Sequence, residues 1–226
     1  MKYLKNYIIL AMAAGSLTAC QTIGTSDERV YERTKEERVD AAIEKAATGA
    51  AQNGSVSGTL LALEKQYKRD GENPNLALGY AQALRQTGYL NRAQMVLKPF
   101  ADKESAVKGA KTEMSVIELG LGNYDAAEKF AQGAVLQDAN DYQAYQNLGI
   151  ALDAKEMHAE AERAFRKGLE HWEGDPTTIM NNLALNLATQ GFIDEAVEVL
   201  ERAKALSPDR VEIERNLRII RTLNER

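Results

Sequence analysis

The chain has 226 residues and a formal net charge of −5, with 33 acidic and 28 basic side chains. This balance, with no basic run in the body of the chain, argues against nucleic acid as a partner. A single cysteine excludes an intramolecular disulfide, and two histidines are too few for most metal sites.

The first residues have the pattern of a bacterial export signal. Lys2 and Lys5 precede an apolar stretch, 7–14, which has the length of a cleaved signal and is too short for a membrane span. Leu17-Thr18-Ala19-Cys20 then resembles the lipobox of bacterial lipoproteins, in which a leucine and small residues precede a cysteine. The resemblance implies that residues 1–19 are a signal peptide and that Cys20 is the lipidated mature N-terminus. The alternative is an ordinary secretory signal followed by a chance cysteine.

The residue after the cysteine is Gln21. In lipoproteins, aspartate at this place retains the protein at the inner membrane, so the resemblance implies the outer membrane and its periplasmic face. Residues 20–54 are mostly polar and charged, with little apolar surface to bury. We therefore predict a lipidated cysteine and a polar tether. A flexible tether of about 30 residues would have a root-mean-square reach of about 30 Å.

Small residues recur at fixed phases through the rest of the chain. One series is spaced by 34, 34 and 35 positions, and two further series keep the same spacings, the last with Glu156 in the slot of a glycine. The three series are Ala81, Ser115, Gly149 and Ala184; Ala93, Ala127, Ala161 and Ala196; and Gly88, Gly122, Glu156 and Gly191. A period near 34 is typical of repeats made of two helices.

The third repeat carries the pattern most completely, with Tyr145, Leu148-Gly149, Leu152, Ala161 and Phe165, while the first helix of the second repeat is degenerate. This pattern resembles the tetratricopeptide repeat (TPR) family. The resemblance implies an all-α, right-handed solenoid of helical hairpins in which stacked repeats bury a shared core. The expected repeats are 74–107, 108–141, 142–176 and 177–210. A capping helix or degenerate repeat is expected at 55–73, and a C-terminal capping helix at 211–226.

The sequence offers little catalytic chemistry. It has no nucleophile elbow and no phosphate-binding loop. His158 and Glu162 are four residues apart, which suits one helix face, and we expect that face to be solvated. Trp172 is expected to pack at a helix end. We therefore predict a protein that is not an enzyme, with no cofactor or metal apart from the lipid on Cys20.

The TPR resemblance implies that the first helix of each repeat lines a groove that binds protein partners. The clamp lysine of chaperone-binding TPR proteins is missing, because Leu78, Thr112 and Gln146 stand in its register. A partner held by its terminal carboxylate in that way is therefore not supported. The polar residues expected to face the groove are Gln82, Arg85, Gln86, Gln143, Gln146, Asn147, Asn181, Asn182 and Thr189.

A lipobox, a charged tether and a few repeats together resemble the TPR lipoproteins of Tad (Flp) pilus assembly. That resemblance implies an outer-membrane secretin or pilus assembly subunits as partners. Two alternatives of the same class are a type IV pilus pilotin and an adaptor for peptidoglycan hydrolases or proteases. An envelope hydrolase or ligand-binding protein is an alternative of another class, and the lack of a chemical site disfavours it.

Overall fold

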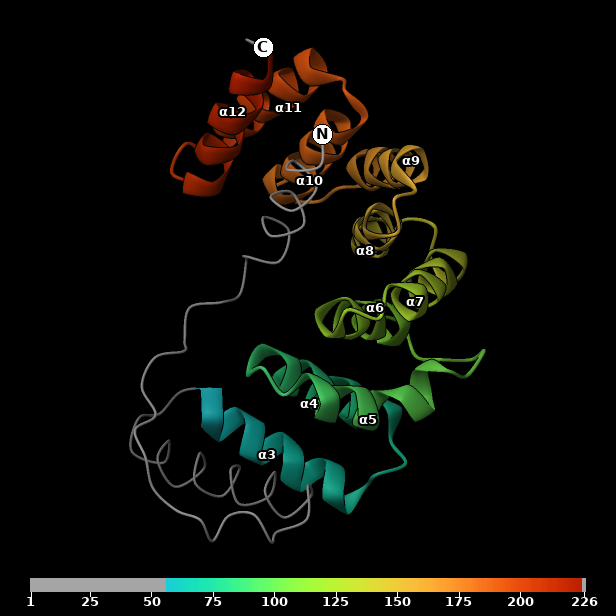
Figure 1. Ribbon diagram of the computed structural model, residues 1–226. Helices are drawn as coiled ribbons and strands as arrows, with labels where there is room; N and C mark the ends of the chain where they lie inside the picture. The colour runs from blue at the N-terminus through green and yellow to red at the C-terminus, as the bar shows by residue number, and fades with distance from the viewer. Residues whose placement is uncertain (1–55, 225–226) are drawn as a thin grey trace, which may run out of the picture. The chain divides into compact units, whose positions relative to one another are not determined.

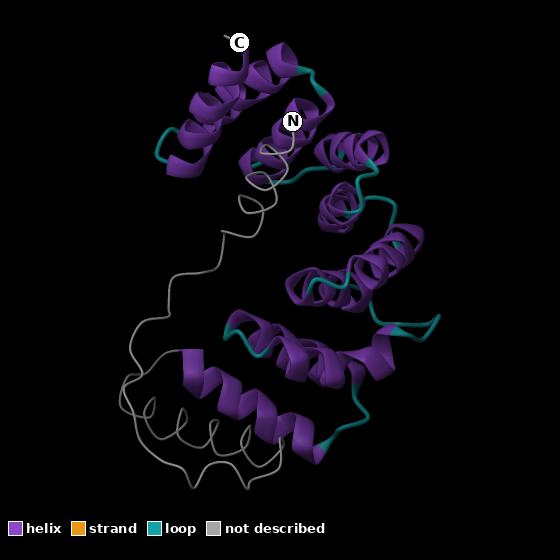
Figure 2. Ribbon diagram, in the orientation of Figure 1, coloured by secondary structure: helices purple, strands orange, loops and turns teal. Residues whose placement is uncertain are grey.

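The computed structural model describes residues 56–224. The predicted signal peptide, Cys20 and the tether lie outside these residues. Ten helices and no strand make up the described part (Figure 2), which confirms the all-α prediction. None of these helices combines the length and hydrophobicity that a membrane span requires.

The described helices follow one another along the chain with short connections. Their bounds are α3 (Val56–Arg69), α4 (Pro74–Gln86), α5 (Leu90–Ala101), α6 (Ala110–Leu121), α7 (Tyr124–Gln137), α8 (Tyr142–Ala154), α9 (His158–Glu170), α10 (Thr177–Gln190), α11 (Ile193–Leu206) and α12 (Val211–Asn224). The chain divides into two compact units at residues 97 and 98, within α5. We call the described residues 56–97 the N-terminal unit and 98–224 the C-terminal unit.

In the N-terminal unit, α3 packs on α4, and a buried ion pair links α3 to α5. Asn73 caps α4, because its side chain accepts hydrogen bonds from two backbone amides of the first turn, and Pro74 occupies the first helical position. Glu64 is buried and lies 2.9 Å from Arg92. The Arg92 guanidinium also lies over the Tyr80 ring, 5.6 Å from its centroid.

The C-terminal unit has two layers of helices (Figure 1). Each helix packs on the next, and α6, α8, α10 and α12 also pack on one another in that order. These four helices form one layer, and α7, α9 and α11 form the other. We call the first layer the inner layer, because the family resemblance assigns the partner-binding groove to it.

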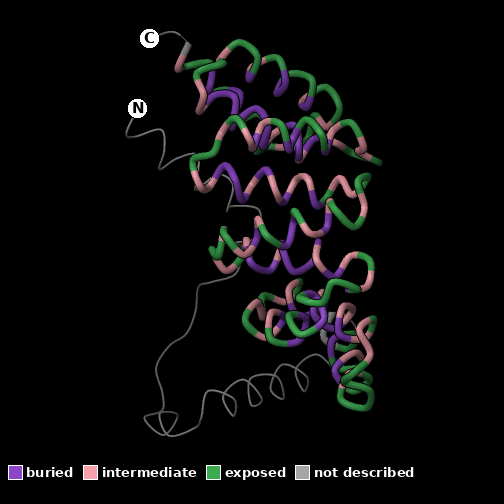
Figure 3. The backbone as a smooth tube through the Cα atoms, turned by 90° about the vertical axis from the view of Figure 1, so that its right-hand side faces the viewer, coloured by how far each residue is buried: buried purple, intermediate pink, exposed green. Residues whose placement is uncertain are grey.

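Small residues set how closely paired helices approach. A Cβ added at Gly149 of α8 would lie 2.5 Å from the Phe165 ring of α9, so the ring occupies the space that a side chain would need. Phe165 is fully buried. Burial alternates along α7, α9 and α11, with one side turned into the core (Figure 3), whereas residues 182–188 of α10 are all buried. The sequence pattern of small and bulky residues is therefore a packing pattern.

The last described helix presents a different surface. Arg218 of α12 stands in the register of Gly149 and Ala184, and its side chain is exposed. A second helix could not pack closely over an arginine at this position. On the opposite side of α12, Ile213, Leu217 and Ile220 are buried against the unit. The helix α12 thus covers the apolar end of the stack and carries charge on its outer side.

Candidate functional site

The structure distributes the predicted groove residues over both units. Gln82, Arg85 and Gln86 lie on α4 of the N-terminal unit, while the other six lie on α8 and α10 of the C-terminal unit. The helices α8 and α10 are neighbours in the inner layer, so the structure brings these six residues onto adjacent helices.

Three of the six residues on α8 and α10 are engaged within the protein. The Asn147 amide donates to the Ser115 hydroxyl at 2.8 Å and approaches the Thr112 carbonyl at 3.4 Å. Asn181 accepts a hydrogen bond from Asn216 of α12, and the Thr189 hydroxyl donates to the Leu185 carbonyl. Asn147 is also buried, so its side chain joins α8 to α6 and is a poor candidate for contact with a partner.

The other three residues, Gln143, Gln146 and Asn182, form no hydrogen bond with any side chain or backbone group of residues 56–224. Gln143 is exposed and Gln146 half-buried, whereas Asn182 has only 8% of its surface exposed. An amide both donates and accepts, which suits the backbone of a bound segment. Among the six residues on α8 and α10, these three have open amides, which means amides without a hydrogen-bond partner in residues 56–224.

Sequence reasoning missed an aliphatic row on the same layer. Val116, Ile150, Leu185 and Ile219 repeat at 34, 35 and 34 positions, one on each inner-layer helix. Each lies four residues after a polar residue and therefore on the same side of its helix. We call these polar residues the polar row: Thr112, Gln146, Asn181 and Arg215. The spacing that revealed the repeats would also have revealed both rows.

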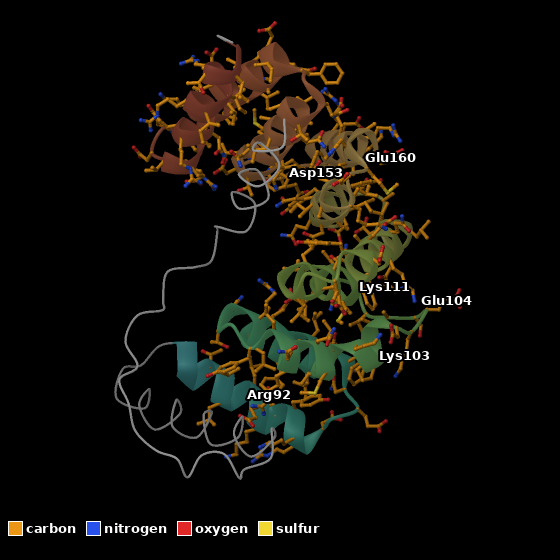
Figure 4. The ribbon with its side chains drawn as sticks, in the orientation of Figure 1. Arg92, Lys103, Glu104, Lys111, Asp153 and Glu160 are labelled. Carbon is orange, nitrogen blue, oxygen red and sulfur yellow. The ribbon has the colours of Figure 1, made fainter. Side chains whose placement is uncertain are left out.

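The prediction that His158 lies on a merely solvated helix face was wrong. Its Nδ1 lies 2.7 Å from an oxygen of Asp153, a buried residue that is labelled in Figure 4. The Asn186 amide donates to the same oxygen at 2.7 Å and to the His158 carbonyl at 3.0 Å. These bonds tie α8, α9 and α10 together. The reason is that Asp153, in the last turn of α8, is buried, and a buried carboxylate requires hydrogen-bond donors.

The same correction applies to Glu162. The Gln190 amide donates to Glu162 at 2.9 Å and to the Asn186 side-chain oxygen at 2.9 Å, which extends the network. Arg166 then bridges Glu162 and Glu195 of α11. Burial alone would raise the pKa of Glu162, but hydrogen bonds from Arg166 and Gln190, together with the positive charges of Arg166 and Arg163, hold the pKa below its usual value. The network is a structural joint between two repeats.

The described residues show no metal-binding group of three or more His, Cys, Asp or Glu side chains. Trp172 packs after the end of α9, with its ring 4.5 Å from that of Tyr142, centroid to centroid. The expectation for this tryptophan agrees with that packing.

Comparison with known proteins supports the same fold. The sequence profile of the tetratricopeptide repeat family matches residues 142–170, the hairpin of α8 and α9. No curated protein matches the chain in sequence.

Solved structures match over most of the chain. MamA from Desulfovibrio magneticus RS-1, residues 41 to the end, is 18% identical with a TM-score of 0.60, covering 76% of this chain and 96% of that one. TTC0263, a thermophilic TPR protein of Thermus thermophilus, is 16% identical with a TM-score of 0.60, covering 80% and 97%. A chain of the APC/C hetero-tetramer Cut9–Hcn1 is 13% identical with a TM-score of 0.66, covering 81% and 40%.

At these identities the structural likeness shows the fold alone. The TPR scaffold is typically non-catalytic and binds protein partners. The chain thus carries tetratricopeptide repeat sequence at residues 142–170, and its described residues have the TPR fold.

Proposed function

We propose that this protein is a lipid-anchored scaffold in the bacterial periplasm that binds a protein partner on its inner layer and does not act as an enzyme. The observation that carries the proposal is the group of open amides on α8 and α10, Gln143, Gln146 and Asn182. They stand on neighbouring helices without a hydrogen-bond partner in residues 56–224. A bound segment can supply backbone partners for such amides.

The anchor is the second part of the proposal. Residues 17–20 have the lipobox pattern, and two or more acyl chains on Cys20 would hold the protein durably at a membrane, since each buried methylene contributes about 0.8 kcal/mol. With Gln21 after the cysteine, we assign the anchor to the periplasmic face of the outer membrane. The polar tether would let the folded units stand clear of that surface.

More specifically, we propose that the protein takes part in the assembly of a Tad (Flp) pilus, with a secretin or another pilus assembly subunit as its partner. Its support is the combination of lipobox, charged tether and repeats. An adaptor for peptidoglycan hydrolases or proteases, or a type IV pilus pilotin, would use the same inner layer with another partner.

The deciding experiment is site-specific photo-crosslinking in living cells with the full chain. A crosslinker at Gln143, which is exposed on the inner layer, is compared with one at Glu198, which is exposed on α11 in the other layer. We expect a protein adduct at Gln143 that is absent at Glu198. A secretin in the adduct supports the pilus assignment, and a cell-wall enzyme supports the adaptor. Equal adducts at both sites, or none at Gln143, would contradict binding on the inner layer.

Lipidation is tested separately by labelling cells with an alkyne fatty acid. We expect the wild-type protein to carry the label and to sediment with outer-membrane vesicles. A Cys20→Ser variant should lose both properties. Labelling that persists in this variant would contradict the proposed anchor.

A further inference from the structure

We infer that the inner layer of the C-terminal unit binds a segment that combines aliphatic side chains with an acidic residue, and that the acidic residue pairs with Arg215. The inference rests on the proposed function, because it names the chemistry of the partner for that layer. Its basis is the arrangement of the polar row and the aliphatic row on the inner layer.

The first step is the apolar half of the surface. Along the aliphatic row, Leu185 is 4% exposed and belongs to the core, whereas Val116 and Ile150 are half-buried and Ile219 is 42% exposed. Leu185 therefore forms part of the base of the row, and its neighbours leave apolar surface in reach of a partner. Aliphatic side chains on the partner would gain free energy by covering that surface.

The second step is the register of the two rows. Two hydrogen bonds join positions that are 35 residues apart, from Asn147 to Thr112 and from Asn216 to Asn181. In both bonds the residue on the later helix stands one position past the repeat equivalent of its partner, so equivalent positions on α6 and α8, and on α10 and α12, lie within about one residue of each other. Since each polar residue is four positions before its aliphatic partner, the two rows run next to each other across α6, α8, α10 and α12.

The third step is charge. Arg215 is the one charged member of the two rows, it is exposed, and no carboxylate of residues 56–224 pairs with it. Two carboxylates of the same helix are already engaged, since Glu212 lies 3.3 Å from Arg210 and Glu214 lies 2.7 Å from Lys204. An unpaired guanidinium at one end of a neutral row favours a carboxylate at the matching end of a partner.

An unbiased phage-displayed peptide library is the probe, selected on the purified full chain. We expect selected peptides to be rich in Leu, Ile and Val and to share one Asp or Glu. Selection on Arg215→Glu should replace the acidic residue by Lys or Arg. A selected peptide should bind this variant about fivefold more weakly than the wild type.

Arg218→Glu is the matched control. Arg218 is exposed on the same helix, but it stands in the register of Gly149 and belongs to neither row. This variant should select the same peptides as the wild type. Ile219→Ser, on the exposed end of the aliphatic row, should reduce the aliphatic enrichment while keeping the acidic residue.

The inference is overturned if selected peptides lack the acidic residue, if Arg215→Glu leaves the preference unchanged, or if no peptide is enriched. These results are distinct from failure of the proposed function. If an adduct forms at Gln143 in cells but any of these three results is also obtained, the proposed scaffold function is kept and only the partner chemistry inferred here is rejected. Absence of that adduct removes the proposed function even if peptides are selected.

Discussion

The third and fourth hairpins share one backbone pattern and hold it with different side chains. In the third, α8 and α9, Gly149 lies beneath Phe165; in the fourth, α10 and α11, the equivalent residues are Ala184 and Leu200. The smaller residue faces the larger ring, and the slightly larger one stands opposite a leucine. The volume of each pair is therefore roughly conserved, as close packing requires.

The two hairpins differ more sharply in polarity. Asp153, His158 and Glu162 of the third hairpin correspond to Ala188, Ile193 and Val197 of the fourth. At these three positions the third hairpin carries side chains that form hydrogen bonds, and the fourth carries apolar side chains. The repeat therefore requires a side chain of suitable size and shape at each position, while the polarity of that side chain can vary.

The largest expected effect comes from the ring that fills the third hairpin. Phe165→Ala should lower the free energy of unfolding by about 3–5 kcal/mol, because the ring is fully buried and its removal leaves a cavity. Chemical denaturation followed by circular dichroism measures the change. Phe192→Ala is the control, since that ring is 53% exposed, and its cost should stay near 0.5 kcal/mol. Equal costs for the two variants would contradict the packing described for Phe165.

The volume relation between the hairpins can be tested by giving the third the pair of the fourth. Gly149→Ala alone should destabilise by about 1–3 kcal/mol, because its Cβ would lie 2.5 Å from the Phe165 ring. Phe165→Leu alone should also destabilise. The double variant should be more stable than the sum of the two costs predicts, by about 1 kcal/mol. A double-mutant cycle measures this coupling, and strict additivity would show that the two positions do not share the space.

Most of this fold could be read from the sequence, because spacing between small residues reflects helix crossings directly. Gly149 and its equivalents, for example, mark every hairpin. The hydrogen-bond network of Asp153, His158, Glu162, Asn186 and Gln190, which we call the polar joint, could not be predicted in the same way. His158 and Glu162 have the spacing of an ordinary solvated face, and only the close approach of α10, which brings Asn186 and Gln190, turns them inward. Tertiary contact, rather than helix periodicity, decides their role.

The candidate site shows the same limit. The family register assigned both residues to the groove-lining first helix of the third repeat, but it could not separate Gln146, whose amide is open, from Asn147, whose amide is engaged. These two residues are adjacent on one helix, and their roles differ because Ser115 and Thr112 lie within reach of Asn147 alone.

Removing a carboxylate from the hydrogen-bond network of Asp153, His158 and Asn186 should lower the free energy of unfolding more than removing a surface charge does. Asp153→Ala should cost about 1–3 kcal/mol, because it leaves the buried Asn186 amide and the partly buried His158 ring without their partner. Asp125→Ala is the control, since Asp125 is exposed and pairs with Lys155 at the surface, and it should cost less than about 1 kcal/mol. A shift of the Asn186 side-chain amide resonances in the Asp153 variant would locate the effect. Unchanged Asn186 resonances would argue against the joint.

The ends of the first helices in the two hairpins provide a smaller contrast. Glu156 has a φ of 65°, and its equivalent Gly191 has a φ of 91°, so both backbones are left-handed. Glu156→Gly should raise the free energy of unfolding by about 1 kcal/mol, because glycine adopts this conformation without steric cost. Gly191→Ala should lower it by about 1–2 kcal/mol. Thermal unfolding of the two variants measures both signs, and a loss of stability in Glu156→Gly would mean that the Glu156 side chain contributes more than its strain costs.

The smallest expected effect is a pH dependence that comes from Glu162, whose equivalent in the fourth hairpin is the uncharged Val197. Since contacts with Arg166 and Gln190 hold the pKa of Glu162 below its unfolded value, this carboxylate stabilises the fold above the unfolded pKa. That contribution disappears as the pH falls through the folded pKa. Glu162→Gln keeps the volume and removes the charge, so its stability deficit relative to the wild type should shrink on acidification. Denaturation of both proteins from neutral to acidic pH measures the difference. A deficit that stays constant would mean that Glu162 acts through shape and neutral hydrogen bonds alone, as Val197 acts through shape in the fourth hairpin.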